Sequence, residues 1–140
     1  MMNPENTKKL FEKYPKLFSE EERNDPKKSL MRYGFGVKDG WFDLMDKLCA
    51  DIQNTIDTEK KTNQEFEQVR VVQVKEKMGG LRFYTDGADE KIAEMIHKAE
   101  KESYKICEVC GKEGKLTNAL IWFKTLCESC KAKGRIVLQQ

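Results

Sequence analysis

The feature that most constrains this chain is a pair of CxxC motifs. Cys107 and Cys110 form the first motif, Cys127 and Cys130 form the second, and sixteen residues separate the two. This spacing is typical of two cysteine pairs that share one zinc ion. One tight turn can present both sulfurs of a pair at the zinc–thiolate distance of about 2.3 Å, and Gly111 tolerates the strained φ of such a turn. Because four thiolates complete a tetrahedron, we predict one structural Zn²⁺ with no open position for catalysis.

The segments beside the cysteines suggest two arrangements for this zinc finger. The apolar stretch from Leu116 to Leu126 is suited to a short hairpin, and Lys131-Ala132-Lys133 resembles the start of a helix. A knuckle, a hairpin and then cysteines at a helix start make a treble clef, whereas a zinc ribbon would place both pairs on knuckles. A redox dithiol is a further alternative, although that chemistry does not need two pairs at zinc spacing.

Two long helices are predicted from apolar periodicity. After Asp39, apolar residues recur at spacings of three and four, and the same period returns between Ala88 and Tyr104. The apolar positions are Trp41, Leu44, Met45, Leu48, Ile52 and Ile56 in the first helix and Ile92, Met95, Ile96 and Ala99 in the second. A shorter helix is expected after Asn3-Pro4-Glu5, which supplies a capping side chain and a proline at the first helical position.

A β-hairpin is predicted between the long helices. The run from Val69 to Lys75 is rich in β-branched residues, Met78-Gly79-Gly80 interrupts it, and Leu81 to Thr85 is again typical of a strand. We therefore expect an α+β fold in which two long helices flank a β-hairpin, with a C-terminal four-cysteine zinc finger of treble-clef or ribbon type. The expected division is an α+β domain over residues 1–104 and a zinc finger over 105–140 that packs on it.

The composition fits one globular domain in a reducing compartment. The chain has 140 residues, of which 39% are hydrophobic and 36% are charged. No apolar run approaches the length of about 18 residues that a membrane-spanning helix needs, and the N-terminal residues are polar. Five cysteines, an odd number, argue against a disulfide framework. We expect a cytoplasmic protein, in the host cell if a phage encodes it.

The hairpin carries the best candidates for contact with a partner. Alternation places Leu81 and Phe83 on one face, and Arg82 and Tyr84 on the other. The partner strand adds two nearby cations, Lys75 and Lys77. Arginine can pair with a phosphate or carboxylate and tyrosine can stack, and a double glycine admits close approach to the backbone. The alternative is an ordinary solvated strand face.

Three other side chains are candidates for a chemical or binding role. Trp41 lies among aromatic and glycine residues, in Asp39-Gly40-Trp41-Phe42, and is a candidate for partner binding, although the pattern favours the alternative, core packing. His97 is the only histidine, and we expect an ordinary helical residue. Cys49 is expected to be a buried apolar residue and not a nucleophile.

Three motifs together resemble a group of small phage and prophage zinc-finger proteins without an assigned activity. They are YGFG with DGWF at residues 33–42, VKEKMGGLRFY at residues 74–84, and the two cysteine pairs. The resemblance covers about residues 30 to 130. It supplies no catalytic residues, and it implies a protein that binds a host component or a signal molecule of antiviral defence.

We therefore expect a non-enzymatic, zinc-stabilised binding protein, with a host protein or a small anionic ligand as its partner and a possible counter-defence role. One alternative is a nucleic-acid-binding regulatory protein, suggested by the lysines of the zinc end and by Trp122-Phe123. The net charge of +2 gives that alternative little support. The other is an enzyme of unknown class, although no paired-carboxylate, nucleotide-loop or nucleophile motif stands out.

Overall fold

The computed structural model describes residues 1–118 and 122–139 and has an α+β fold, as predicted. Its described part contains five α-helices, two antiparallel hairpins and two short 3-10 turns. In chain order the elements are α1 (Pro4–Lys13), α2 (Glu20–Arg23), η1 (Met31–Tyr33), η2 (Asp39–Trp41), α3 (Phe42–Lys60), β1 (Arg70–Lys77), β2 (Gly80–Asp86), α4 (Glu90–Ser103), β3 (Lys115–Thr117), β4 (Lys124–Leu126) and α5 (Glu128–Gln139).

Helix α1 begins where the sequence predicts. The side chain of Asn3 accepts a hydrogen bond from the backbone N–H of Asn6 at 2.8 Å, and Pro4 occupies the first helical position. The cap also fixes α1 to the rest of the fold, because Asp39 accepts a hydrogen bond from the backbone N–H of Asn3 at 3.0 Å. A residue of η2, which directly precedes α3, thus holds the start of α1.

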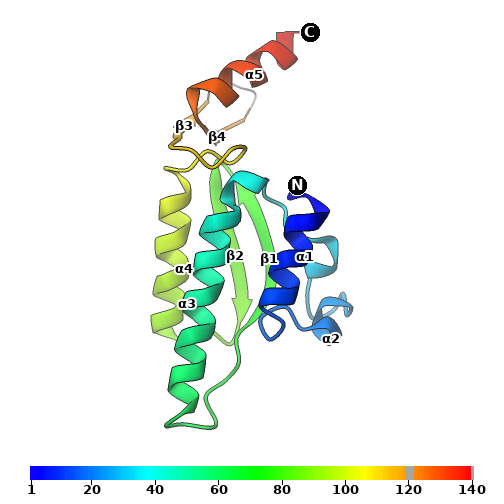
Figure 1. Cartoon of the computed structure of the whole chain (residues 1–140), viewed down its shortest axis with the longest axis vertical. Coiled ribbons are helices and arrows are strands. Elements are labelled where there is room, and N and C mark those ends of the chain that lie inside the picture. Colours follow the sequence, from blue (N-terminus) through cyan, green and yellow to red (C-terminus); the bar gives the residue numbers. More distant parts are fainter. Residues whose placement is uncertain (119–121, 140) are drawn as a thin grey trace.

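The long helices α3 and α4 precede and follow the β1–β2 hairpin in the chain and lie side by side in space (Figure 1). Helix α4 packs against both β2 and α3. The apolar stripes predicted from the period of three and four face the core, with these residues buried: Met45, Leu48, Cys49, Ile52 and Ile56 on α3, and Ile92, Ile96 and Ala99 on α4.

The β1–β2 hairpin contributes its inner face to the same core. A β-bulge between Val71 and Gln73 shifts the alternation of β1, so that Val71 and Val74 are both buried. On β2, Leu81 and Phe83 are buried, whereas Arg82 is half-buried and Tyr84 is exposed. The predicted division of β2 into two faces is therefore confirmed.

Both edges of this two-stranded sheet are covered. On the β1 side, the backbone of residues 17–36 makes hydrogen bonds to it, including Leu30 N–H to the Val72 carbonyl at 2.7 Å. On the β2 side, Ser103 Oγ accepts from Leu81 N–H at 2.9 Å, and the Glu100 carboxylate accepts from Phe83 N–H at 3.0 Å. The edges are therefore protected from pairing with another strand.

The cysteine-rich end extends beyond the body of the molecule. Figure 1 shows β3, β4 and α5 at one end of the long axis, next to the turn of the β1–β2 hairpin and the C-terminal end of α4. The short hairpin predicted between Leu116 and Leu126 is present as β3 paired with β4. Its residues 119–121 lie outside the described residues. Among the helices that are described, none is both long enough and apolar enough to cross a membrane.

Trp41 requires a correction. It was a candidate for partner binding, but its side chain is 0% exposed and its indole N–H donates to the Ile106 carbonyl at 2.8 Å. The ring therefore fills the core beneath the segment that leads to Cys107, and it has no surface to offer a partner. The alternative interpretation, core packing, is the one that the structure supports.

Trp41 is part of the seam, our name for the contacts between the main body and the cysteine-rich end. Replacing each tryptophan by phenylalanine tests this contact. Trp41→Phe leaves the Ile106 carbonyl without its donor and should lower the free energy of unfolding by about 1–3 kcal/mol. Trp122 is 67% exposed, so Trp122→Phe should change it by no more than about 0.5 kcal/mol. Denaturant unfolding monitored by circular dichroism measures both, and equal losses would show that the Trp41 contact is not important.

Candidate functional site

The four cysteines of the two motifs converge on one point. Their sulfur atoms all lie within 4.8 Å of one another, and this is the one group of potential metal ligands found in the described residues. Cys107 and Cys110 come from the loop after α4, Cys127 directly precedes α5, and Cys130 lies in its first turn. The four thiols form a group that can hold a metal ion.

The first pair is shaped by a tight turn. The backbone N–H of Gly111 donates to the Cys107 carbonyl at 2.9 Å, and Gly111 has a φ of 82°, which favours glycine. Around this turn, Cys107 N–H donates to the Lys112 carbonyl at 2.7 Å, and Gly114 N–H donates to the Lys105 carbonyl at 2.8 Å. These bonds close the loop so that both sulfurs point the same way without the help of a large core.

The second pair uses the start of a helix. The backbone N–H of Cys130 lies 3.5 Å from the sulfur of Cys127 and, together with hydrogen bonds from the neighbouring thiols, lowers the pKa of Cys127 to about 7. Burial and the same neighbours raise the pKa of Cys130 in the metal-free group. This environment favours the thiolate at Cys127, and the thiolate is the form of cysteine that binds a metal ion.

The first cysteine loop is docked onto the start of α3. The backbone N–H of Gly40 donates to the Glu108 carbonyl at 2.8 Å. A Cβ at Gly40 would lie 2.2 Å from the Cys107 carbonyl oxygen, a distance that real Cβ atoms do not show. Only glycine therefore allows this approach of the two backbones, and Gly40 is a structural residue that the sequence motif did not reveal.

A small ionic network closes the other side of the seam. Lys124 on β4 lies 2.7 Å from the Glu76 carboxylate and 3.8 Å from that of Glu108. The Glu108 side chain is 3% exposed and also accepts a hydrogen bond from Lys38 N–H at 3.3 Å. Burial raises the pKa of Glu108, and the positive charge of Lys124 opposes that shift. The network joins β1, the cysteine loop and β4.

The double glycine of the hairpin serves internal packing, which corrects the expectation that it admits a ligand. Both residues are buried: a Cβ at Gly79 would lie 2.4 Å from the Leu116 side chain, and one at Gly80 would lie 2.3 Å from the Tyr104 hydroxyl. The hydroxyl of Thr125 also donates to the Gly79 carbonyl at 2.6 Å. The turn is thus the platform on which β3 and β4 rest.

The candidate binding residues of the hairpin do lie together on its outer face. Lys75 is directly opposite Arg82 in the strand register, and its ammonium lies 5.6 Å from the centre of the Tyr84 ring. Lys77 is exposed beside the turn. The guanidinium of Arg82 is within 3.4 Å and 3.3 Å of the Tyr104 hydroxyl through its two terminal nitrogens. Tyr104, from the C-terminal end of α4, is a neighbour that sequence analysis missed.

Neither of the remaining candidate residues is placed for chemistry. Cys49 is 0% exposed, and burial raises the pKa of its thiol far above the usual value, so it is an apolar core residue as predicted. His97 is exposed on α4, next to Lys91, Lys98 and Lys101 around a shallow depression. His97 therefore lies on the exposed surface of a helix, as predicted.

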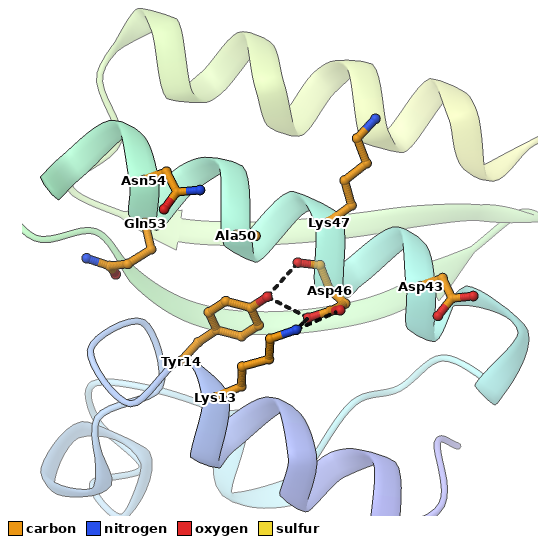
Figure 2. Close-up of a pocket in the computed structure, with 8 residues that line it drawn as sticks. All are labelled: Lys13, Tyr14, Asp43, Asp46, Lys47, Ala50, Gln53 and Asn54. Atoms are coloured by element: carbon orange, nitrogen blue, oxygen red, sulfur yellow. Dashed lines mark hydrogen bonds and ion pairs between the residues drawn. The ribbon is translucent and has the colours of Figure 1, made fainter. Parts of the chain in front are cut away.

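A second depression, of about 460 Å³, lies between α1 and α3 and has a structural explanation (Figure 2). The Tyr14 hydroxyl donates to both the carboxylate and the backbone carbonyl of Asp46, and Lys13 lies 2.9 Å from the same carboxylate. Burial alone would raise the pKa of Asp46, but the hydrogen bonds from Tyr14 and Lys13 lower it. Burial and Asp46 raise the pKa of Tyr14. Such a tyrosine is neither a base nor a nucleophile at neutral pH.

Comparison of the chain with protein-family models, with curated proteins and with solved structures found no match.

The metal group makes a direct prediction about composition. The purified protein should carry about one zinc ion per chain, and Cys110→Ser should lose it because a tetrahedral site needs all four thiolates. Cys49→Ala should keep the metal and cost only about 1 kcal/mol, because Cys49 lies outside the group. Elemental analysis by mass spectrometry reads out the metal. Metal-free protein with a fully protected C-terminal region in hydrogen exchange would contradict the assignment.

The ion pairs of Lys124 lead to a second prediction. Lys124→Ala leaves the Glu76 and Glu108 carboxylates facing each other without a cation and should lower the free energy of unfolding by roughly 3 kcal/mol. Lys105 pairs with Glu102 in a solvated position, so Lys105→Ala should change it by no more than about 0.5 kcal/mol. Thermal unfolding of the zinc-loaded proteins compares Lys124→Ala with Lys105→Ala. Similar stability of the two variants would show that the ionic network is dispensable.

Proposed function

We propose that this chain is a zinc-stabilised binding protein without catalytic activity, and that its partner contacts the outer face of the β1–β2 hairpin through Lys75, Lys77, Arg82 and Tyr84. The observation that carries the proposal is a group of three cations that lie outside the ion pairs of the described residues, although the Glu100 carboxylate acts on Arg82 from a greater distance. Within the described part of the chain, none of the basic side chains Lys75, Lys77 and Arg82 forms an ion pair. Two of these cations, Lys75 and Arg82, are directly opposite each other in the strand register.

Like charges placed opposite each other across two strands destabilise a hairpin. A bound anion would relieve that repulsion and would gain charge-assisted hydrogen bonds to the guanidinium. The hydrogen bonds to Tyr104 raise the pKa of Arg82, so its charge is constant over the physiological range. Tyr84 adds an exposed ring beside the cations. This combination supports an anionic group on the partner, either a carboxylate or a phosphate.

The metal group supports a structural role for zinc in this proposal. Thiolate ligands favour zinc over hard cations, and four of them leave no coordination site for water or substrate. The order of a cysteine turn, a hairpin and a helix that begins at the second pair supports the treble-clef arrangement over the zinc ribbon.

The biological setting is proposed from the resemblance of the sequence motifs. We infer a small phage accessory protein that acts in the host cytoplasm on a host factor or a signal molecule, with a counter-defence role. An anionic partner is compatible with either, because signal molecules of nucleotide type carry phosphates and protein partners carry carboxylates.

Retention on an immobilised polyanion tests the proposed surface. Arg82→Ala should elute from heparin at clearly lower salt than the wild type, because a charge-assisted contact is worth about 1.5–3 kcal/mol. The melting temperature should stay nearly unchanged. Arg23→Ala is the matched control, since Arg23 stacks on Phe11 at 4.2 Å on a different part of the molecule.

Two results would contradict this function. Equal elution of Arg82→Ala and Arg23→Ala would place the anion-binding surface elsewhere. A large loss of stability in Arg82→Ala would make Arg82 a structural residue that holds Tyr104. The nucleic-acid alternative is distinguished by direct titration with DNA and RNA, where phosphate contacts give binding that weakens steeply with added salt.

A further inference from the structure

An exposed apolar group lies where the metal-bearing hairpin meets the turn of the main hairpin. Met78, Leu116 and Phe123 are 58%, 48% and 40% exposed, respectively. The Leu116 side chain lies against Gly79, the residue that follows Met78 in the turn. Leu116 stands opposite Thr125, whose hydroxyl bonds to the Gly79 carbonyl, and Phe123 is two residues from Thr125 along the chain. We call Met78, Leu116 and Phe123 the apolar tip.

The backbone at Met78 is unusual for such an exposed residue. Its φ is 52°, and that of Gly79 is 87°, as the two central residues of a type I′ hairpin turn require. Asparagine, aspartate or glycine normally fills the first of these positions, because other side chains are strained in the left-handed region. A long apolar side chain therefore occupies a position where a small polar residue would give a more stable turn. A polar residue there would also expose less apolar surface to water.

The charges beside the apolar tip indicate which partner fits it. Met78 and Leu116 directly follow the exposed lysines Lys77 and Lys115. The basic outer face of β1 and β2 begins at the same turn, with Lys77 and Lys75 two residues apart on β1 and Arg82 directly opposite Lys75 on β2. The tip and the basic face thus form a continuous surface that is apolar at one end and cationic at the other.

A second copy of this chain does not complement that surface, because symmetric pairing of two tips would bring the flanking lysines together. A nucleic acid would use the cations and the rings of Phe123 and Tyr84, but it carries no aliphatic group to cover the exposed side chains of Met78 and Leu116. An added β-strand is also excluded as the mode of binding, because Ser103 and Glu100 occupy the N–H groups on the outer edge of β2.

We propose that the apolar tip and the adjoining basic face form the docking site for a protein segment that carries an apolar anchor next to acidic residues. The anchor contacts Met78, Leu116 and Phe123, and the carboxylates lie over Lys75, Lys77 and Arg82. This inference rests on the proposed function and specifies the class of partner, a polypeptide and not a free anion.

Selection from a displayed library of random peptides tests the proposal, with the zinc-loaded full chain as the target. Enriched peptides should combine large apolar residues with Asp or Glu. Met78→Asn is the decisive variant, because asparagine tolerates the positive φ, so its melting temperature should equal or exceed that of the wild type. Its affinity for an enriched peptide should fall about tenfold or more, as expected for the loss of an anchoring contact.

Heparin elution separates a failure of this inference from a failure of the proposed function. Met78→Asn should elute from heparin like the wild type, whereas Arg82→Ala should weaken both heparin and peptide binding. Peptide binding that is unaffected by Met78→Asn, or enrichment of peptides without acidic residues, would overturn the docking site while leaving the anion surface intact. Concentration-dependent dimers that Met78→Asn abolishes would overturn it as well, by assigning the tip to a second copy. If Arg82→Ala kept both heparin binding and peptide binding, both proposals would be overturned.

Discussion

The convergence of four cysteine sulfurs on one point is the constraint on which the C-terminal part of this fold depends. Among residues 105–118 and 122–134, whose side chains are described, Cys107 and Leu126 are the only hydrophobic side chains that are buried. Burial on that scale cannot offset the conformational entropy of ordering a loop, a hairpin and a helix. A metal ion held by the four cysteines, as we propose, would supply the missing free energy and would fix the distance between the two cysteine pairs. The placement of β3, β4 and the start of α5 follows from it.

The main body is stabilised differently, and the seam between the two parts uses polar contacts. Helices α1, α3 and α4 and the β1–β2 hairpin enclose an apolar core, as their buried residues show. At the seam, by contrast, the Gly40–Glu108 backbone bond, the Trp41 indole and the Lys124 ion pairs make the connection. The metal-bearing segment therefore rests on the same turn from which the basic hairpin surface extends.

The sequence predicted the features that depend on local periodicity. The asparagine cap of α1, the apolar stripes of α3 and α4, the alternation of β2 and the spacing of the cysteine pairs are all encoded within short windows. The sequence did not reveal contacts between distant residues, such as Tyr104 with Arg82 or Lys124 with Glu76. Trp41 and the double glycine were misjudged for the same reason, because a periodic pattern cannot distinguish a surface that is open from one that another segment covers.

X-ray absorption spectroscopy at the zinc edge of the purified, unreconstituted protein is the most direct measurement of the central claim. The account predicts a single shell of four sulfur atoms at about 2.3 Å with no nitrogen or oxygen ligand, since all four positions of the tetrahedron are thiolates. The spectrum of Cys49→Ala should be identical. A shell that includes light-atom ligands would mean an open site and a possible catalytic metal, and absence of a bound metal would contradict the structural role assigned to Cys107, Cys110, Cys127 and Cys130.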